Sequence, residues 1–348
     1  QAPEAFAALE NWKPRVQWML DNPEAVDECW YRADTRLEQA GQHHIVLFDA
    51  LDRTADDWPT MNRLVRGLLQ VVLDPRAFRR IRLKVFARPD QLEDPIVASF
   101  PDASKVLNQK IVLEWPRREL YGLLWQYLAN EQGYGDQFRS SVQGMLPLIR
   151  WKQEDGVWLV PGGLRRSEDP QKTIFHAITG PWMGKDKRRG FPYSWLPSHL
   201  GDARGEVSPR SFLAALRHAA QDEPRTSQEF ALHYESIKRG VQEASKIRVR
   251  ELEEDYPWIR ALFEPLAGIT VPCHLDEIAR VWRQYRVVED LERKIQNQAV
   301  RLPPSHIAEG EDGVLLDLIE LGLVERLKDN RLNLPDVYRV GYGMGRRG

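Results

Sequence analysis

The chain has 348 residues, of which 42% are hydrophobic and 29% charged, the composition of an ordinary globular protein with room for two or three domains. Its 49 Lys and Arg against 51 Asp and Glu leave a net charge of −2, so no overall positive field attracts nucleic acid. Two distant cysteines, Cys29 and Cys273, exclude a thiolate-rich zinc site and a disulfide scaffold, and indicate a reducing compartment. No apolar run approaches the ~20 residues of a membrane span and no signal peptide opens the chain, so we expect a cytoplasmic protein with no membrane partner.

The first 43 residues predict helices, and a short strand follows them. The apolar run Ile45–Phe48 ends at Asp49 and continues as Ala50-Leu51-Asp52-Arg53. Such a run is typical of a buried parallel strand with a carboxylate at its carboxyl end, which in P-loop NTPases holds the water shell of a nucleotide-bound Mg²⁺. Apolar residues at helical spacing then predict a helix over 59–73.

Two further strands complete an alternating pattern. The run Ile81–Ala87 ends at Arg88-Pro89-Asp90, and Gln109–Trp115 is followed by a predicted helix over Arg118–Asn130. Strands alternating with helices imply right-handed crossovers and a parallel sheet. We therefore expect an α/β fold, with a parallel sheet covered by helices on both faces.

The rest of the chain has a different pattern. Helical segments dominate from about residue 136, with a long loop over 186–205, a helix opened by Ser208-Pro209, and a long charged helix over 226–255. Near the carboxyl end, a helix over 313–321 precedes a hairpin that turns at 328–331 into a strand over 332–340. A helix followed by a hairpin is typical of a winged helix.

The order of these features resembles the C-terminal part of a bacterial STAND or KAP-like P-loop ATPase. No single motif is specific, and the resemblance depends on their order along the chain. The matching residues are Asp49, Leu51, Asp52 and Arg53 after the first strand, Arg88-Pro89-Asp90 after the second, Trp115-Pro116 and Glu119-Leu120 after the third, and Pro209-Arg210 at the start of the later helix.

The resemblance implies four parts and a set of site residues. The parts are a helical segment (1–43), the C-terminal half of a P-loop NTPase core with Walker B and sensor strands (44–135), a helical lid region with a basic loop (136–265) and a winged helix (266–348). Asp49 would bind Mg²⁺ through water, and Asp49 and Asp52 would be the catalytic acids. ATP would be contacted by Arg53, Arg88, Asp90 and Arg210.

Two departures from this family pattern bear on catalysis. Many members carry a second acid directly after the Mg²⁺-associated Asp, where this chain has Ala50, so slow or absent hydrolysis is open. The chain also contains no G-x-x-x-x-G-K-[ST] motif. The nearest approach, Gly180–Asp186, is one residue short and lies downstream of the Walker B strand, so a surface loop is the simpler interpretation. The resemblance therefore implies that the phosphate loop is supplied by a missing N-terminal segment or a partner chain.

The sequence leaves two functions open. The first is an ATP-dependent molecular switch, in a setting of prokaryotic defence or regulation, with an effector protein or a homo-oligomer as partner. The second is a non-enzymatic scaffold, for protein or DNA, on a degenerate NTPase fold. DNA binding by the winged helix is less favoured, because acids such as Glu325 and Asp329 alternate with its bases. Each site residue also has a structural alternative, for example an ion pair between Asp52 and Arg53 or between Arg88 and Asp90.

Overall fold

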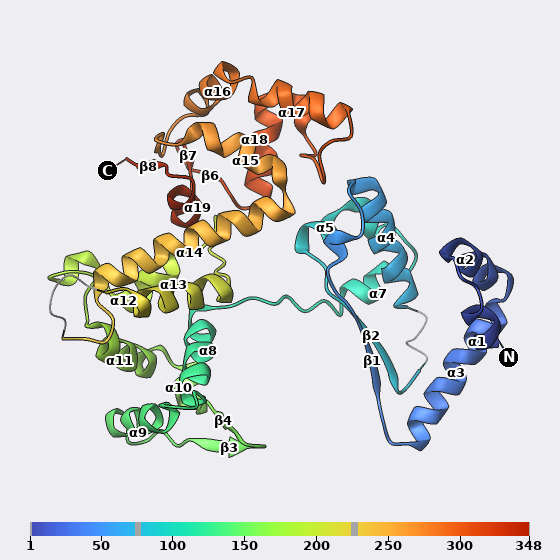
Figure 1. Ribbon diagram of the computed structural model, residues 1–348, viewed down its shortest axis with the longest axis horizontal. Helices are drawn as coiled ribbons and strands as arrows, with labels where there is room; N and C mark the ends of the chain where they lie inside the picture. The colour runs from blue at the N-terminus through green and yellow to red at the C-terminus, as the bar shows by residue number, and fades with distance from the viewer. Residues whose placement is uncertain (1, 74–77, 224–228, 348) are drawn as a thin grey trace. The chain divides into compact units, whose positions relative to one another are not determined.

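The structure, a computed structural model, describes residues 2–73, 78–223 and 229–347, and these fold into two compact units, Gln1–Ile111 and Val112–Gly348. Both units are mostly helical (Figure 1). The expected P-loop core with its parallel sheet covered on both faces is wrong, because the strands of the described residues form four separate two-stranded sheets. Helices contribute most of the packing in each unit.

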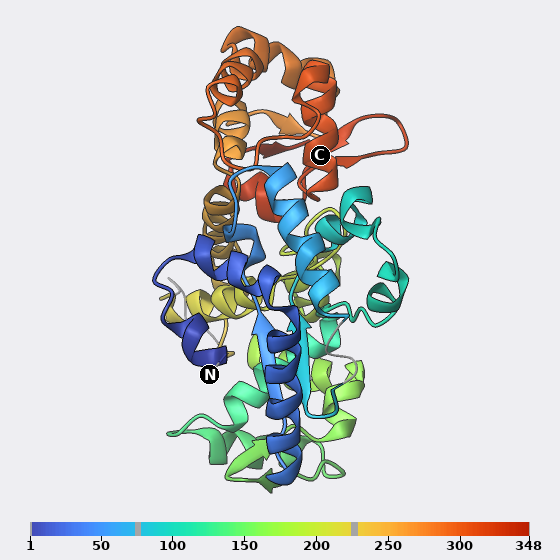
Figure 2. The same cartoon turned by 90° about the vertical axis from the view of Figure 1, so that its right-hand side faces the viewer.

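The N-terminal unit combines helices with one small parallel sheet. Strands β1 (His44–Phe48) and β2 (Ile81–Val85) pair along their whole length and lie side by side in both views (Figures 1 and 2). A 3-10 turn, Leu51–Arg53, follows β1. The helices are α1 (Ala2–Ala7), α2 (Trp12–Asp21), α3 (Pro23–Gln39), α4 (Trp58–Val71), α5 (Pro89–Glu93), α6 (Pro95–Ala98) and α7 (Ala103–Leu107).

Helix α4 forms the core of this unit, close to the bounds predicted from its apolar spacing. Asp57 caps it by accepting a hydrogen bond from the backbone N–H of Thr60 at 2.8 Å. Its buried face meets α6 and α7 in a small cluster that also takes in the inward side of β2. The buried members of the cluster are Val65, Leu69, Val97, Phe100 and Ala103.

The third predicted strand, Gln109–Trp115, is absent. In the described part of the chain, the segment makes no strand pairing and its apolar side chains are exposed, with Ile111 at 78% and Leu113 at 72%. An apolar run becomes a strand only where a neighbouring edge pairs with its backbone, and a single sequence does not reveal that edge. The prediction failed because it used composition alone.

The C-terminal unit is built from twelve helices and three small sheets in its described residues. The helices are α8 (Arg117–Ala129), α9 (Gly135–Met145), α10 (Gly162–Arg166), α11 (Glu168–Thr179), α12 (Pro192–Ser198), α13 (Pro209–Gln221), α14 (Tyr234–Asp255), α15 (Pro257–Phe263), α16 (Leu275–Gln284), α17 (Val287–Gln296), α18 (Gly310–Glu320) and α19 (Asp336–Gly341). The strands are β3 (Lys152–Glu154), β4 (Val157–Leu159), β5 (Thr270–Val271), β6 (Glu325–Arg326), β7 (Leu332–Asn333) and β8 (Gly345–Arg346), with 3-10 turns at Lys187–Arg189, Glu264–Leu266 and Ile307–Glu309.

Aromatic side chains fill the core between α8, α11, α12 and α13. The ring of Tyr121 is stacked on that of Tyr193, with centroids 4.2 Å apart, and meets Phe175 and Phe212 edge-on. The Tyr121 hydroxyl donates a hydrogen bond to the Tyr193 carbonyl at 2.9 Å. Burial raises the pKa of the Tyr121 phenol well above its ordinary value, so this hydroxyl remains a donor.

Helices α13 and α14 pack at very close range, because a glycine lies between them. A Cβ atom on Gly240 would lie 2.2 Å from the carbonyl oxygen of Ala215 and 3.1 Å from the backbone nitrogen of Ala219. The predicted helix start at Ser208-Pro209 is confirmed, with Pro209 in the first turn of α13.

The carboxyl-terminal region contains the predicted helix and hairpin, but the second strand is shorter than expected. Helix α18 is followed by the antiparallel pair β6–β7, and the orange-red hairpin projects from its helices in Figure 2. The strand predicted over 332–340 is wrong beyond Asn333, since Pro335 caps helix α19 there. Cys273 joins the hairpin through an antiparallel bridge to Leu332. No helix among the described residues is both long and apolar enough to cross a membrane.

Candidate functional site

The best candidate site lies at the carboxyl edge of the β1–β2 pair. Parallel pairing in the register Phe48↔Val85 places Asp49, one residue after β1, and Phe86, one residue after β2, at the same edge. The backbone N–H of Phe86 donates to the carbonyl of Phe48 at 2.9 Å, which extends the ladder to this edge. Ligands of parallel sheets bind beyond the carboxyl ends of the strands, so this edge is where a ligand would be expected.

Asp49 is exposed at this edge, and the next residue has an unusual backbone. Ala50 has a φ of 56°, in the left-handed region that residues with a side chain seldom adopt. The carboxylate of Asp49 accepts a hydrogen bond from the Ala50 N–H at 2.7 Å. This bond holds one carboxylate oxygen against the turn, and no other described residue donates a hydrogen bond to the Asp49 side chain.

The remaining predicted residues of this unit follow the two strands. Arg88 is the residue before α5 and is half-buried, and its backbone N–H donates to the side-chain carbonyl of Gln91 at 3.1 Å. Arg53 is exposed at the end of the 3-10 turn. The side chains of Asp52 and Asp90 lie outside the described part of the structure. The fold thus brings Asp49 and the segment leading to Arg88 to one edge.

The two faces of the β1–β2 pair differ. Val46 and Leu83 are half-buried on the face that carries Ile81, whereas the opposite face exposes Ile45 at 56% and Leu47 at 62%. Opposite these two on β2 are the exposed cations Arg82 and Lys84. This face therefore carries two apolar and two cationic side chains, and a sheet of two strands is marginal by itself.

Arg210, the predicted lid arginine, lies in the C-terminal unit. Its guanidinium donates to the Glu251 carboxylate at 2.8 Å, which joins the start of α13 to α14 and raises the pKa of Arg210. The structure gives Arg210 a structural partner in its own unit. Its role at a nucleotide remains a prediction from the resemblance.

One acid that anchors the other end of this sheet, before β2, was not predicted from the sequence. The carboxylate of Asp34, on α3, accepts hydrogen bonds from the backbone N–H groups of Arg80 at 2.7 Å and Arg79 at 3.1 Å. Asp34 therefore ties α3 to the chain just before β2. Its only signal in the sequence was an acid on a polar helix face, which does not identify a partner 46 residues away.

The described residues also contain one group of three side chains with metal-ligand chemistry, His306, Asp317 and Glu320. Its buried carboxylate, Asp317, already accepts bonds from the N–H groups of Ser305 and His306 and from the His306 ring, at 2.9 to 3.1 Å. These hydrogen bonds join the loop at Ser305 and His306 to α18 and account for the cluster, so we do not assign it a metal.

Comparison with known proteins gives this chain no relative: no family model, no curated protein and no solved structure matches it.

Proposed function

We propose that this chain supplies the acidic edge of a nucleotide site and acts as an ATP-dependent switch together with a segment that carries the phosphate-binding loop. The observation that supports this most is the parallel pairing of β1 and β2, because it brings Asp49 and the segment before Arg88 to one edge. Asp49 would hold Mg²⁺ through water, and Arg88 would contact the phosphate oxygens.

The exposed apolar residues support a partner for this edge. Ile45 and Leu47 on β1 present apolar side chains that a further strand-bearing segment would cover. The strands of the described residues form only two-stranded sheets, so the phosphate contacts of the proposed site would come from that segment. Ala50, in place of a second acid, fits a switch with slow turnover.

The test begins with the reading frame upstream of Gln1 and continues with its complete product. We expect that frame to encode a strand followed by G-x-x-x-x-G-K-[ST], and its product to bind a fluorescent ATP analogue more tightly with Mg²⁺ than with a chelator. The variant Asp49→Ala should remove the Mg²⁺-dependent part of the affinity. The matched control is Asp27→Ala, since Asp27 is an exposed acid on α3. Equal Mg²⁺-dependent affinity in Asp49→Ala and the unsubstituted protein would refute the assignment.

A protein-interaction scaffold is the second candidate, and the exposed apolar segment around Leu113 favours it. A scaffold would bind a protein partner through exposed apolar side chains without a nucleotide, and Ala50 is equally compatible with it. The two candidates differ in one measurement. A scaffold leaves the product of the complete reading frame unable to bind the ATP analogue, with or without Mg²⁺.

A further inference from the structure

A loop in the C-terminal unit combines exposed cations with the half-buried Trp182 and the exposed Phe191. We call residues 180–191 the basic loop. It leaves α11 at Gly180, which has a φ of 75°, and it closes on itself where the N–H of Met183 donates to the carbonyl of Gly190 at 2.9 Å. Met183 is 1% exposed and anchors the loop in the aromatic core. The loop is therefore built into the unit and presents its remaining side chains outward.

The basic loop forms one wall of a cavity, and the chain before and at the start of α14 forms the other. The N–H of Leu232 donates to the carbonyl of Ile178 at 3.0 Å, and the Phe230 ring lies so close to Gly180 that a Cβ there would be 2.9 Å from it. The cavity has a volume of about 220 Å³. It is lined by Thr179, Pro181, Trp182, Gly184, Glu229, Phe230, Leu232, His233 and Tyr234.

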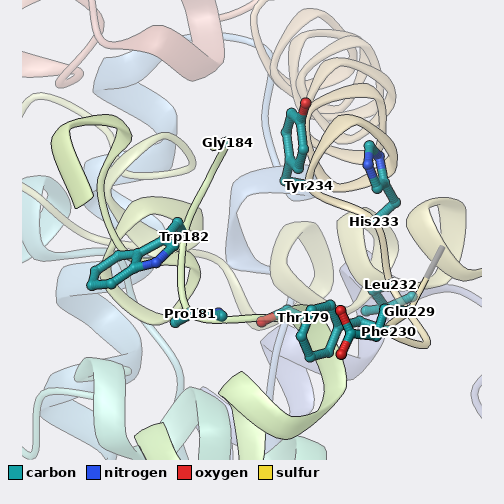
Figure 3. Close-up of a pocket in the computed structure, with 9 residues that line it drawn as sticks. All are labelled: Thr179, Pro181, Trp182, Gly184, Glu229, Phe230, Leu232, His233 and Tyr234. Carbon is teal, nitrogen blue, oxygen red and sulfur yellow. The ribbon is translucent and has the colours of Figure 1, made fainter. Parts of the chain in front are cut away.

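Three aromatic side chains determine the character of this cavity. Figure 3 shows Trp182 on one side and Tyr234 on the other, with Phe230 beside Thr179. Trp182 contacts Phe191, whose ring centroid is 4.9 Å away and whose side chain is 46% exposed. A cavity of this size lies below the range that encloses a drug-sized molecule, so it suits a single planar ring system.

The charges around this cavity are mainly positive. Lys185, Lys187, Arg188 and Arg189 are all exposed on the basic loop. The Asp186 carboxylate forms an ion pair with the Arg188 guanidinium, with an N–O distance of 3.0 Å, and this contact lowers the pKa of the Asp186 carboxyl. Among the described residues, no carboxylate lies within ion-pair distance of Lys185, Lys187 or Arg189.

Glu229 is the one acid among the residues that line the cavity. Lys238 on α14 forms an ion pair with Glu235 at 3.0 Å. The Lys238 ammonium lies over the Tyr234 ring, 5.1 Å from its centroid. The cations therefore outnumber the acids around the aromatic rings, although the whole chain is slightly acidic.

From this arrangement we infer that the basic loop and its cavity bind single-stranded nucleic acid. One unstacked base stacks on Trp182 at the cavity, and the flanking phosphates lie against Lys185, Lys187 and Arg189. Aromatic stacking surfaces beside cations that follow a phosphate backbone are the common features of single-strand sites. A paired base cannot enter this cavity without leaving its stack, so a duplex is disfavoured. The inference depends only on the C-terminal unit and does not require ATP.

The test is fluorescence anisotropy with the full chain and a labelled oligothymidylate of about 20 nucleotides. Two further probes of the same length are compared with it. An abasic deoxyribose-phosphate strand tests the contribution of the bases, and a duplex of mixed sequence tests the preference for a single strand. We expect the order oligothymidylate, then abasic strand, then duplex in falling affinity. Affinity should also fall as salt is raised from about 50 to 200 mM.

Two variants and one control locate the site. Trp182→Ala should weaken oligothymidylate binding by about 5- to 150-fold and leave abasic binding nearly unchanged. Lys187→Glu with Arg189→Glu should weaken both single strands and lower the salt slope by about 1.4, the loss of two phosphate contacts. Arg217→Glu with Arg326→Glu reverses two exposed cations elsewhere in the same unit and should have little effect.

Several outcomes would overturn the inference. These are no binding of oligothymidylate at about 50 mM salt, equal affinity for the abasic strand, tighter binding of the duplex, or an equal loss in the control variant. Circular dichroism of each variant separates a lost contact from a lost fold. If Trp182→Ala unfolds, Trp182→Phe keeps a stacking surface and should retain most of the affinity. Free AMP or TMP that competes as well as the oligonucleotide would show a mononucleotide site and would also overturn it.

Discussion

The close packing of α13 on α14 leaves no room for a side chain at Gly240. A methyl group there would lie 2.2 Å from the carbonyl oxygen of Ala215, whereas Cβ atoms essentially never approach within 3.0 Å of another heavy atom. The obstacle is backbone on α13, so no side-chain rotation relieves it. The variant Gly240→Ala therefore has to separate the two helices by about 1 Å.

Two opposing effects set the size of the change. Alanine stabilises a helix interior by about 1 kcal/mol relative to glycine. Forcing atoms into a packed core costs about 1–3 kcal/mol and sometimes more, and a backbone obstacle belongs at the upper end. We expect a net loss of about 2 kcal/mol in the free energy of unfolding.

The assay is urea unfolding followed by circular dichroism and tryptophan fluorescence. The control is Gly144→Ala in α9, where a new methyl group meets nothing within 4 Å, so only the helix preference acts. That variant should unfold at the same or a higher urea concentration than the unsubstituted protein. Equal stability of Gly240→Ala and Gly144→Ala would refute the close contact between α13 and α14 at this position.

Three further predictions concern charge and exposure. The hydrogen bond to Asp317 raises the pKa of His306. His306 therefore stabilises the fold fully below pH 6.5, and this stabilisation is lost as the pH rises through its folded pKa. The melting temperature of His306→Asn should fall further below that of the unsubstituted protein at pH 5.5 than at pH 8.5. The hydrogen bond from Arg239 is the main cause that lowers the pKa of Asp222 to about 2, so the Asp222 carboxylate stabilises the fold fully above pH 3.8. The loss of melting temperature in Asp222→Asn should therefore become smaller as the pH falls towards 2. A loss that stays constant with pH would contradict this. Leu113→Ser should change the unfolding free energy by no more than about 0.5 kcal/mol, because the side chain is 72% exposed; a loss above 1 kcal/mol would mean that the segment is paired in solution.

The sequence predicted helices better than sheets, and the reason is physical. Helix signals are local: Asp57 marks the start of α4 and Pro209 that of α13, and apolar residues at helical spacing mark the buried face. A strand needs a partner from elsewhere in the chain. The runs that form β1 and β2 pair with each other, whereas the equally apolar segment around Leu113 pairs with no strand among the described residues.

The candidate site was predictable to a similar degree. Strand ends place Asp49 and the chain before Arg88 on one edge once the strands are known to be parallel, and this pairing was expected. The left-handed backbone of Ala50 was not predictable, and neither were the hydrogen bonds to Asp34 at the other end of the sheet, because neither depends on neighbouring residue types. The cavity beside Trp182 was missed for the same reason. It needs the chain before α14 to meet the basic loop, about 50 residues earlier.

The two proposals stand on different units, so each can fail alone. Loss of ATP binding in Asp49→Ala says nothing about the cavity, and loss of oligonucleotide binding in Trp182→Ala says nothing about the strand edge. If both hold, the protein has two ligands whose coupling is measurable. Coupling is reciprocal, so Mg²⁺-ATP must change the affinity for oligothymidylate by the same factor as oligothymidylate changes the affinity for Mg²⁺-ATP. A factor of one would mean that the nucleotide switch does not control the cavity, and its output would then have to lie in another surface.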